Sequence, residues 1–356
     1  MKRILLILIL PLLLLCAGCQ DSIYANYRDV EHLRPVQMLG FDADPDSGAV
    51  IVSVSAGEGR PEKSPAVLSQ AGGSIETALV QLQNAFPEAQ PYYAHVQFVL
   101  FGRAAAEQGM RPWLEWIERN PKMRLDPAAF VVRDSAAELI LSSAAENSGT
   151  TQKMTSLDSE LHTLGEGYAF LIRSLAATLA DNGSGLCGAI RCADKSGAIR
   201  FDDSASILPA GFAVFRDERL CTFIEEEDAP AVLLLLSRPE GARVELDAGD
   251  DGRVTVALGA GHTKIDLDGA AARVDCSVEA SLLETDGGAP DMETVTALLS
   301  ERLTRQTEGI LALEHSLGCD FLGLTDGRDP AALDFSVSVT VQPERSYGLR
   351  QREEGA

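Results

Sequence analysis

The amino-terminal segment constrains the architecture of the chain more than any other feature. Met1-Lys2-Arg3 precedes an apolar run from Ile4 to Leu15, interrupted by Pro11, and the run ends in Cys16-Ala17-Gly18-Cys19. A positively charged start, a short apolar stretch and closing small residues are typical of a secretory signal peptide. The run is shorter than the roughly 20 residues that a membrane-spanning helix needs. We therefore expect residues 1–18 to be a signal peptide that is removed.

The end of this segment also predicts how the chain is held at a membrane. Ala17-Gly18-Cys19 resembles a bacterial lipobox, in which Cys19 would receive lipid and become the mature amino terminus. Plain secretion and an uncleaved anchor are the alternatives. The chain from Cys19 onward has 28 basic and 53 acidic residues, a formal charge of −25, so an anionic membrane surface would repel it. A lipid anchor suits such a chain, since each buried CH₂ of an acyl chain contributes about 0.8 kcal/mol.

Composition narrows the class of protein further. The 356 residues include 30 Lys and Arg against 53 Asp and Glu, which leaves no broad basic surface for nucleic acid. With 46% hydrophobic residues the chain is too apolar to be disordered, and its length suits two or three domains. The longest later apolar stretch, residues 229–236, is too short to cross a membrane. We expect the rest of the chain to be a soluble ectodomain.

The hydrophobic pattern of the first half predicts a tether, residues 19–34, and then a mixed domain over 35–182. Apolar alternation predicts a β-hairpin from residues 36–41 and 49–55, followed by a long exposed loop over 57–73. Ser74 is a suitable cap for the helix that follows. The later expected elements are a strand over 92–101, a helix over 102–119, a strand over 130–132, a helix over 135–145 and one long amphipathic helix from 157 to its stop at Asn182-Gly183.

The second half predicts a separate region joined by a Gly-rich linker over 183–204. A hairpin of residues 211–215 and 220–224 precedes a short helix that ends near residue 236. The region extends over 205–345, and a polar tail fills 346–356. Its remaining expected elements are strands over 243–246, 254–258, 263–267 and 272–283, a long amphipathic helix over 293–317 and a final strand over 335–341. The predicted class is α+β: a multi-domain, mixed α/β chain with mainly antiparallel sheets and long amphipathic helices.

The cysteines fit no zinc spacing. Beyond Cys19, an odd number remains, so they cannot all pair with one another. Cys187 and Cys192 are close enough in sequence for a small disulfide loop, and a reduced pair is the alternative. The other three, Cys221, Cys276 and Cys319, are in apolar contexts typical of small buried residues.

Catalytic motifs are missing from the sequence. It contains no phosphate-binding Gly-rich loop, no His-Glu-x-x-His and no Gly-x-Ser-x-Gly, and its five histidines are isolated from one another. His95 is the most distinctive of them because it follows a Tyr pair inside an apolar run. We expect His95 to be buried and held by a backbone carbonyl. A role as a ligand or a catalytic residue is the alternative. We therefore expect no enzyme activity, no cofactor and no metal.

A specific combination of segments, in the same order along the chain, resembles a known family. The segments are Val36-Gln-Met-Leu-Gly-Phe-Asp42, Ser74-Ile-Glu-Thr-Ala-Leu79, Tyr93-Ala-His95, Phe98-Val-Leu-Phe-Gly102, Ala106-Glu-Gln-Gly109, Glu118-Arg-Asn-Pro121, Gly211-Phe-Ala-Val-Phe215 with Leu220, and Gly318-Cys-Asp-Phe-Leu-Gly323. They resemble the Ger(x)C family, the C subunits of spore germinant receptors, and the lipobox agrees because these proteins are lipoproteins.

The resemblance implies a function and a cellular location. It implies a non-enzymatic, lipid-anchored subunit on the outer face of the inner spore membrane, working with two integral membrane subunits, A and B, in a nutrient-sensing receptor that starts germination. A docking role in assembly and germination signalling is the hypothesis. The family's three α/β domains imply a possible further boundary near residue 285. A lipid-anchored solute-binding protein of a membrane transporter is the alternative, and it would have two doubly wound lobes.

Overall fold

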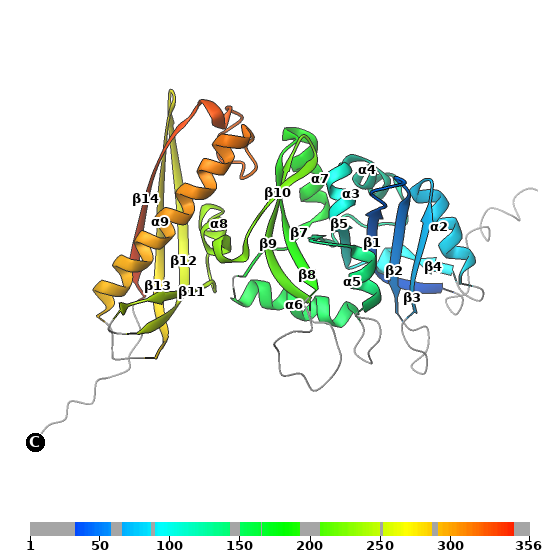
Figure 1. The fold of residues 1–356 in the computed structure, drawn as a ribbon, viewed down its shortest axis with the longest axis horizontal. Coiled ribbons are helices and arrows are strands. Elements are labelled where there is room, and N and C mark those ends of the chain that lie inside the picture. The colour runs from blue at the N-terminus through cyan, green and yellow to red at the C-terminus, as the bar shows by residue number, and fades with distance from the viewer. Residues whose placement is uncertain are drawn as a thin grey trace, which may run out of the picture.

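A computed structural model describes residues 33–57, 66–86, 90–142, 150–164, 166–192, 207–249, 252–286 and 291–344. The predicted signal peptide, Cys19, the tether up to residue 32, residues 193–204 of the predicted linker and the tail over 346–356 all lie outside these residues. Two units lie side by side along the long axis of the molecule (Figure 1).

The first unit is built on a ten-stranded mixed sheet. Its strand order is β10-β9-β8-β6-β5-β1-β2-β3, with β4 also paired to β1 and β7 to β6. The strands are β1 (Leu33–Ala43), β2 (Val50–Ala56), β3 (Ala66–Gly72), β4 (Gln90–Tyr92), β5 (Phe98–Gly102), β6 (Ala128–Val132), β7 (Phe170–Leu171), β8 (Gly185–Cys192), β9 (Ile207–Arg216) and β10 (Arg219–Ile224).

The centre of this sheet is parallel and its flanks are antiparallel. Strands β1, β5, β6 and β8 run in one direction, whereas β2 and β3 on one flank and β9 and β10 on the other pair antiparallel. All residues of β5 and β6 are buried, as expected for central parallel strands covered on both faces. Consecutive side chains of β5 enter different cores, Val99 and Phe101 on one face and Phe98 and Leu100 on the other.

Helices cover both faces of the large sheet. On the face of Val99 lie α2 (Ile75–Asn84), α3 (Arg103–Gln108), α4 (Arg111–Arg119) and α7 (Ile172–Asn182). On the face of Leu100 lie α5 (Ala136–Ser142) and α6 (Thr150–Leu164). Helix α2 begins where expected, because the Ser74 hydroxyl accepts the Thr77 backbone N–H at 3.2 Å.

The second unit is a four-stranded sheet covered by helices. Its strands are β11 (Arg243–Asp247), β12 (Arg253–Asp268), β13 (Ala271–Thr285) and β14 (Asp334–Pro343), in that spatial order. Strand β14 pairs parallel to β13 through the crossover helix α9 (Met292–Leu317). Its core also contains α8 (Ala229–Leu235), every residue of which is buried. Two short 3₁₀ turns, η4 (Glu226–Asp228) and η6 (Pro330–Ala332), lie at its rim.

Much of this agrees with the sequence. The α+β class with mixed sheets is confirmed, as are the two hairpins β1–β2 and β9–β10, the short helix α8 and the long helix α9. The parallel pairing at the centre of the large sheet was not predicted. None of the described helices is both long enough and apolar enough to cross a membrane.

Several element boundaries differ from the prediction. The expected loop over 57–73 contains β3, and the strand expected over 92–101 is interrupted by the 3₁₀ turn η2 (Tyr93–His95). The helix expected over 102–119 is two helices, because Gly109 between them has φ +126°, a conformation that a helix cannot continue through. The long helix expected from 157 to 182 is α6 and α7, separated by β7.

The expected division of the chain also changes. The segment expected as a linker, 183–204, includes β8, which is hydrogen-bonded between β6 and β9, so residues 185–192 belong to the large sheet. The large sheet continues to Ile224, and the two units meet at residues 225–228. Residue 285 ends β13 and marks no boundary, because α9 and β14 after it share one core with β13.

Candidate functional site at the junction of the two units

The two residues singled out from the sequence do not form a site together. Cys19 lies outside the described residues. His95 is exposed in η2, with its ring centroid 5.5 Å from that of Tyr92, so the expected buried, carbonyl-bound histidine is wrong. The run around His95 is apolar, but the chain leaves the extended conformation at Tyr93, and this turns the imidazole outward.

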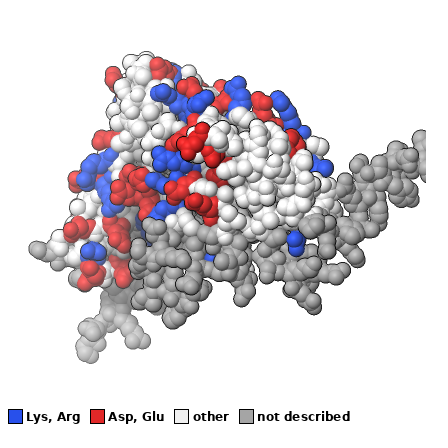
Figure 2. Space-filling model, turned by 45° about the vertical axis from the view of Figure 1, so that its right-hand side comes forward, with Lys and Arg blue, Asp and Glu red and all other residues white. Residues whose placement is uncertain are grey.

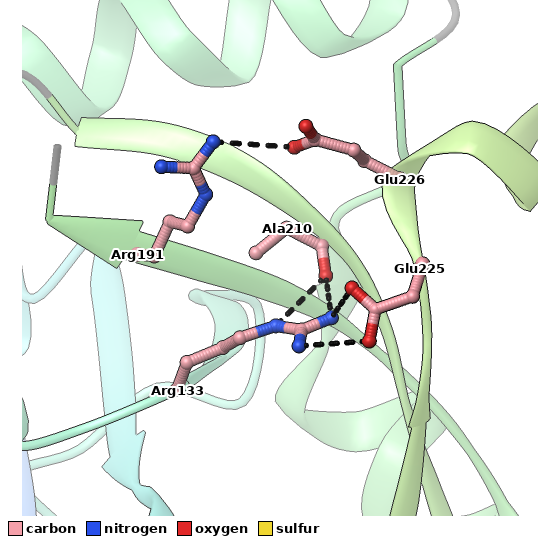
Figure 3. Close-up of polar contacts among 5 residues, drawn as sticks. All are labelled: Arg133, Arg191, Ala210, Glu225 and Glu226. Atoms are coloured by element: carbon pink, nitrogen blue, oxygen red, sulfur yellow. Dashed lines mark hydrogen bonds and ion pairs between the residues drawn. The ribbon is translucent and has the colours of Figure 1, made fainter.

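One group of polar contacts centres on Arg133, which follows the carboxyl end of β6 (Figure 3). Its guanidinium donates to both carboxylate oxygens of Glu225, at 3.0 and 2.8 Å, and from Nε and Nη2 to the Ala210 carbonyl, at 3.3 and 2.9 Å. The guanidinium carbon also lies 4.6 Å from the ring centroid of Phe223. Arg133 therefore joins β6, β9 and β10 to the first residue after the large sheet, with the planar fork that only arginine offers.

A second ion pair lies beside the first. Nη2 of Arg191, near the end of β8, is 3.6 Å from a carboxylate oxygen of Glu226 (Figure 3). The two arginines follow or end neighbouring parallel strands, β6 and β8, and the two glutamates are consecutive. The pairs thus connect the carboxyl edge of the large sheet to the segment that begins the second unit.

Backbone packing makes this junction tight. Gly211 has φ +77°, and a β-carbon there would lie 2.0 Å from the Ile224 carbonyl oxygen. Residues of the large sheet, among them Leu186, Phe212 and Val214, share one hydrophobic core with α8 and with the four-stranded sheet. The interface between the units is therefore apolar inside and bridged by ion pairs at its edge, so they form one continuous body.

A cleft of about 770 Å³ opens at the other end of the junction. Arg216 of the first unit contacts the carboxyl end of α9 there, and Ser184 contacts the segment that follows α9. Nη1 of Arg216 donates to the Leu317 carbonyl at 3.1 Å, and the Ser184 hydroxyl donates to the Asp320 carbonyl at 3.1 Å. The Asp320 carboxylate accepts the backbone N–H groups of Leu324 and Thr325, at 2.7 and 2.9 Å, which fixes the shape of this segment.

Behind this segment lies a buried carboxyl group, Glu314. It has no exposed surface, and its Oε1 accepts the Leu322 N–H at 2.9 Å, while Oε2 has no hydrogen-bond partner. The pKa of Glu314 is raised to about 8, mainly by burial; the Leu322 N–H opposes the rise and the nearby Asp320 carboxylate adds to it. Glu314 is therefore mostly protonated at neutral pH.

A second buried carboxylate organises the first unit. Asp42 at the end of β1 accepts the N–H groups of Ala136 and Ala137, at 3.0 and 2.7 Å, so it caps α5 from a distant strand. Burial raises the pKa of Asp42, and these two hydrogen bonds oppose the rise. Its contacts are those of a structural cap.

The cysteines do not form the small disulfide loop that was considered. Cys187 and Cys192 lie in the same strand, β8, five residues apart, which separates them by about 16 Å at the usual strand rise. A disulfide needs α-carbons within about 7 Å. Cys187 is instead fully buried, with its thiol donating to the Ala129 carbonyl, and burial raises its pKa to about 12.

The polar groups at the junction contact one another. In the ranges that the structure covers, no three His, Cys, Asp or Glu side chains gather as a metal site requires. The arginines and carboxylates at the junction bind one another or backbone carbonyls. The chemistry that the junction supports is attachment between the units. The sequence does not predict this junction, because Arg133 and Glu225, which bridge it, are 92 residues apart and follow no motif spacing.

Comparisons with known proteins agree with one another. Residues 26–162 match the family model described as the spore germination protein N-terminal domain. A solved structure described as the crystal structure of the GerBC protein is similar over 86% of this chain and 96% of that chain, with a TM-score of 0.55 and 13% sequence identity. At that identity the likeness is one of fold, and it extends over both units. No curated protein matches the chain in sequence.

Proposed function

We propose, from the premise that this chain is a spore germination protein of the Ger(x)C family, that it is the C subunit of a nutrient-sensing germinant receptor. The single observation that carries the proposal is the match of residues 26–162 to the germination protein domain, supported by the shared fold of the remaining chain. The transporter alternative has no such support. It also requires two doubly wound lobes, whereas the described residues form one ten-stranded sheet and one four-stranded sheet.

The subunit acts at the outer face of the inner spore membrane, held by lipid on Cys19. The lipobox-like Ala17-Gly18-Cys19 supports this anchor. A lipid anchor holds the chain where surface charge cannot, because the chain from Cys19 onward, with a net charge of −25, gains nothing from an anionic bilayer surface.

Its role is non-enzymatic: it docks the A and B integral membrane subunits and contributes to receptor assembly and germination signalling. The junction supports this role. A rigid body with an apolar interface and the bridge of Arg133 to Glu225 can hold partner contacts on both units in fixed relative positions.

Deletion of the chain in spores tests the proposal. Without it, the A and B subunits should fail to accumulate as a complex, and the germination response to nutrient should fall by at least about tenfold; re-expression of the chain should restore both. A receptor that assembles and responds normally without the chain would overturn the proposed role.

A further inference from the structure

Among the described residues, one edge of the large sheet has no further strand paired to it. Strand β3 is the last strand on its side and pairs only with β2, in a regular register from Val50–Gly72 to Ala56–Ala66. In the part of the chain that the structure describes, no hydrogen bond joins the outward backbone groups of β3 to any residue. A row of unpaired N–H and C=O groups is a template for another strand.

The other edge strands carry the protections that proteins normally place there. Strand β11 alternates charge at Arg243, Glu245 and Asp247. Strand β10 begins with Arg219 and has a register irregularity between Leu220 and Thr222. On β14 the Val339 carbonyl accepts the hydroxyl of Ser300 from α9, at 2.6 Å. Strand β3, with the sequence Ala-Val-Leu-Ser-Gln-Ala-Gly, has no charge, no proline and no bulge.

The surface around this edge is also without charge. Residues 49–57 and 66–86, which contain β2, β3 and α2, include a single charged side chain, Glu76. Two large apolar side chains are exposed on the helices that pack against β3, namely Val80 of α2 (57%) and Leu141 of α5 (46%). In Figure 2 a broad uncharged area lies on the side that carries β3 in Figure 1, and charged side chains lie above it and to its left.

The short segment between the predicted anchor and β1 limits how far β3 can lie from the bilayer. The described chain begins at Leu33 in β1, and β3 is two strands from β1, about 10 Å away at the usual strand spacing. The 14 residues from Cys19 to Leu33 can extend at most about 50 Å. An anchored chain therefore keeps β3 within reach of segments that emerge from the same membrane.

We propose that the open edge of β3 binds an extended, uncharged segment of an integral membrane partner, which adds to the sheet as an eleventh strand. The inference rests on the proposed function and names the surface through which that docking occurs. The partner strand carries apolar or small polar side chains that contact Val80 on one face and Leu141 on the other. A second copy of this chain is disfavoured as occupant, because it would bring together two bodies that, from Cys19 onward, each carry a charge of −25.

Site-specific photocrosslinking in spore membranes tests this surface. A benzophenone amino acid replaces the exposed Ala71 of β3 in the full chain, and a matched probe replaces Ser336, which is exposed on the edge strand β14. The expected result is a crosslink from position 71, at least about fivefold above that from position 336, to an uncharged extramembrane segment of a polytopic protein. A crosslink from position 71 to a second copy of the chain, to lipid or to residues 19–32 of the chain itself would overturn the proposal, as would equal labelling from both probes.

A charge at the edge gives an independent readout. Gln70→Lys should reduce the recovery of the polytopic partners with the tagged chain at least about tenfold, whereas Ser336→Lys should leave it within about twofold. Retained circular dichroism and thermal unfolding of both variants show that each is folded. If the wild-type chain recovers no polytopic subunit, the proposed function itself fails. If the wild-type chain recovers them and Gln70→Lys does so equally well, only the β3 surface fails.

Discussion

A β-carbon on Gly102 would lie 1.7 Å from Oδ1 of Asp42. The two residues end neighbouring parallel strands, β5 and β1, and the missing side chain at Gly102 is the space in which the Asp42 carboxylate reaches α5. The backbone angle of Gly102, φ −66°, is one that any residue can adopt. Glycine is therefore required at this position by the close approach of Asp42 and not by the backbone conformation.

The first prediction concerns this pair. Gly102→Ala should lower the free energy of unfolding by about 2–4 kcal/mol, because it displaces a buried carboxylate from two backbone N–H groups. Asp42→Ala should cost about 1–3 kcal/mol. In the Asp42→Ala background the cost of Gly102→Ala should fall by more than about 1 kcal/mol, as urea unfolding of the four proteins can measure. Simple additivity of the two substitutions would show that they do not interact.

The second prediction concerns the junction. Arg133→Ala removes four hydrogen bonds and the contact with Phe223, and should cost about 1–3 kcal/mol of unfolding free energy. Glu225→Ala should cost less than about 1 kcal/mol, since the Glu225 side chain is 59% exposed. Arg133→Lys should recover less than half of the loss, because an ammonium cannot form the planar fork. A larger loss for Glu225→Ala than for Arg133→Ala, measured by urea unfolding, would contradict this assignment.

The third prediction is a pH dependence that arises from Glu314. Its pKa rises from 4.5 to about 8 on folding, so the stability that the neutral group contributes is complete below pH 4.5 and is lost as the pH rises towards 8. The wild-type chain should therefore lose about 4 kcal/mol more than Glu314→Gln between pH 5 and pH 9, because the amide keeps an acceptor for the Leu322 N–H but does not ionise. Urea unfolding at pH 5, 7 and 9 compares the two. Parallel pH profiles would place the ionisation elsewhere.

The fourth prediction concerns the thiols. Cys187 and Cys319 should resist alkylation in the folded protein, because each is buried and burial raises the pKa of each thiol to about 12, whereas Cys221, which is exposed, should react before both. Peptide mapping after alkylation under non-reducing conditions measures this order. A peptide that links Cys187 to Cys192 would contradict the strand geometry of β8.

The sequence predicts those elements whose pattern is local. Alternation over Val50–Ala56 predicts β2, Ser74 predicts the start of α2, and the period of residues 293–317 predicts α9. Strand β3 is missed because Ala-Val-Leu-Ser-Gln-Ala-Gly has a weak strand preference, and its conformation comes from pairing with β2.

Strand β8 is missed for a related reason. Its glycines suggest a linker, yet Gly188 is buried, and a β-carbon there would lie 2.5 Å from the Tyr168 carbonyl and 3.2 Å from the Phe130 ring. Glycine at position 188 is therefore required by close packing inside the sheet and does not mark a linker. The junction cannot be predicted either, because the distance between Arg133 and Glu225 in sequence gives no periodicity to detect. The family resemblance succeeds because it rests on many segments in a fixed order.

The most direct test of the account is recovery of the tagged chain from detergent-solubilised spore membranes, with co-purifying chains identified by mass spectrometry and Cys19 examined for acylation. We expect two polytopic subunits in comparable amounts and an acylated amino-terminal Cys19. An acylated chain that co-purifies with an ATPase and a permease would contradict it and indicate a solute-binding protein.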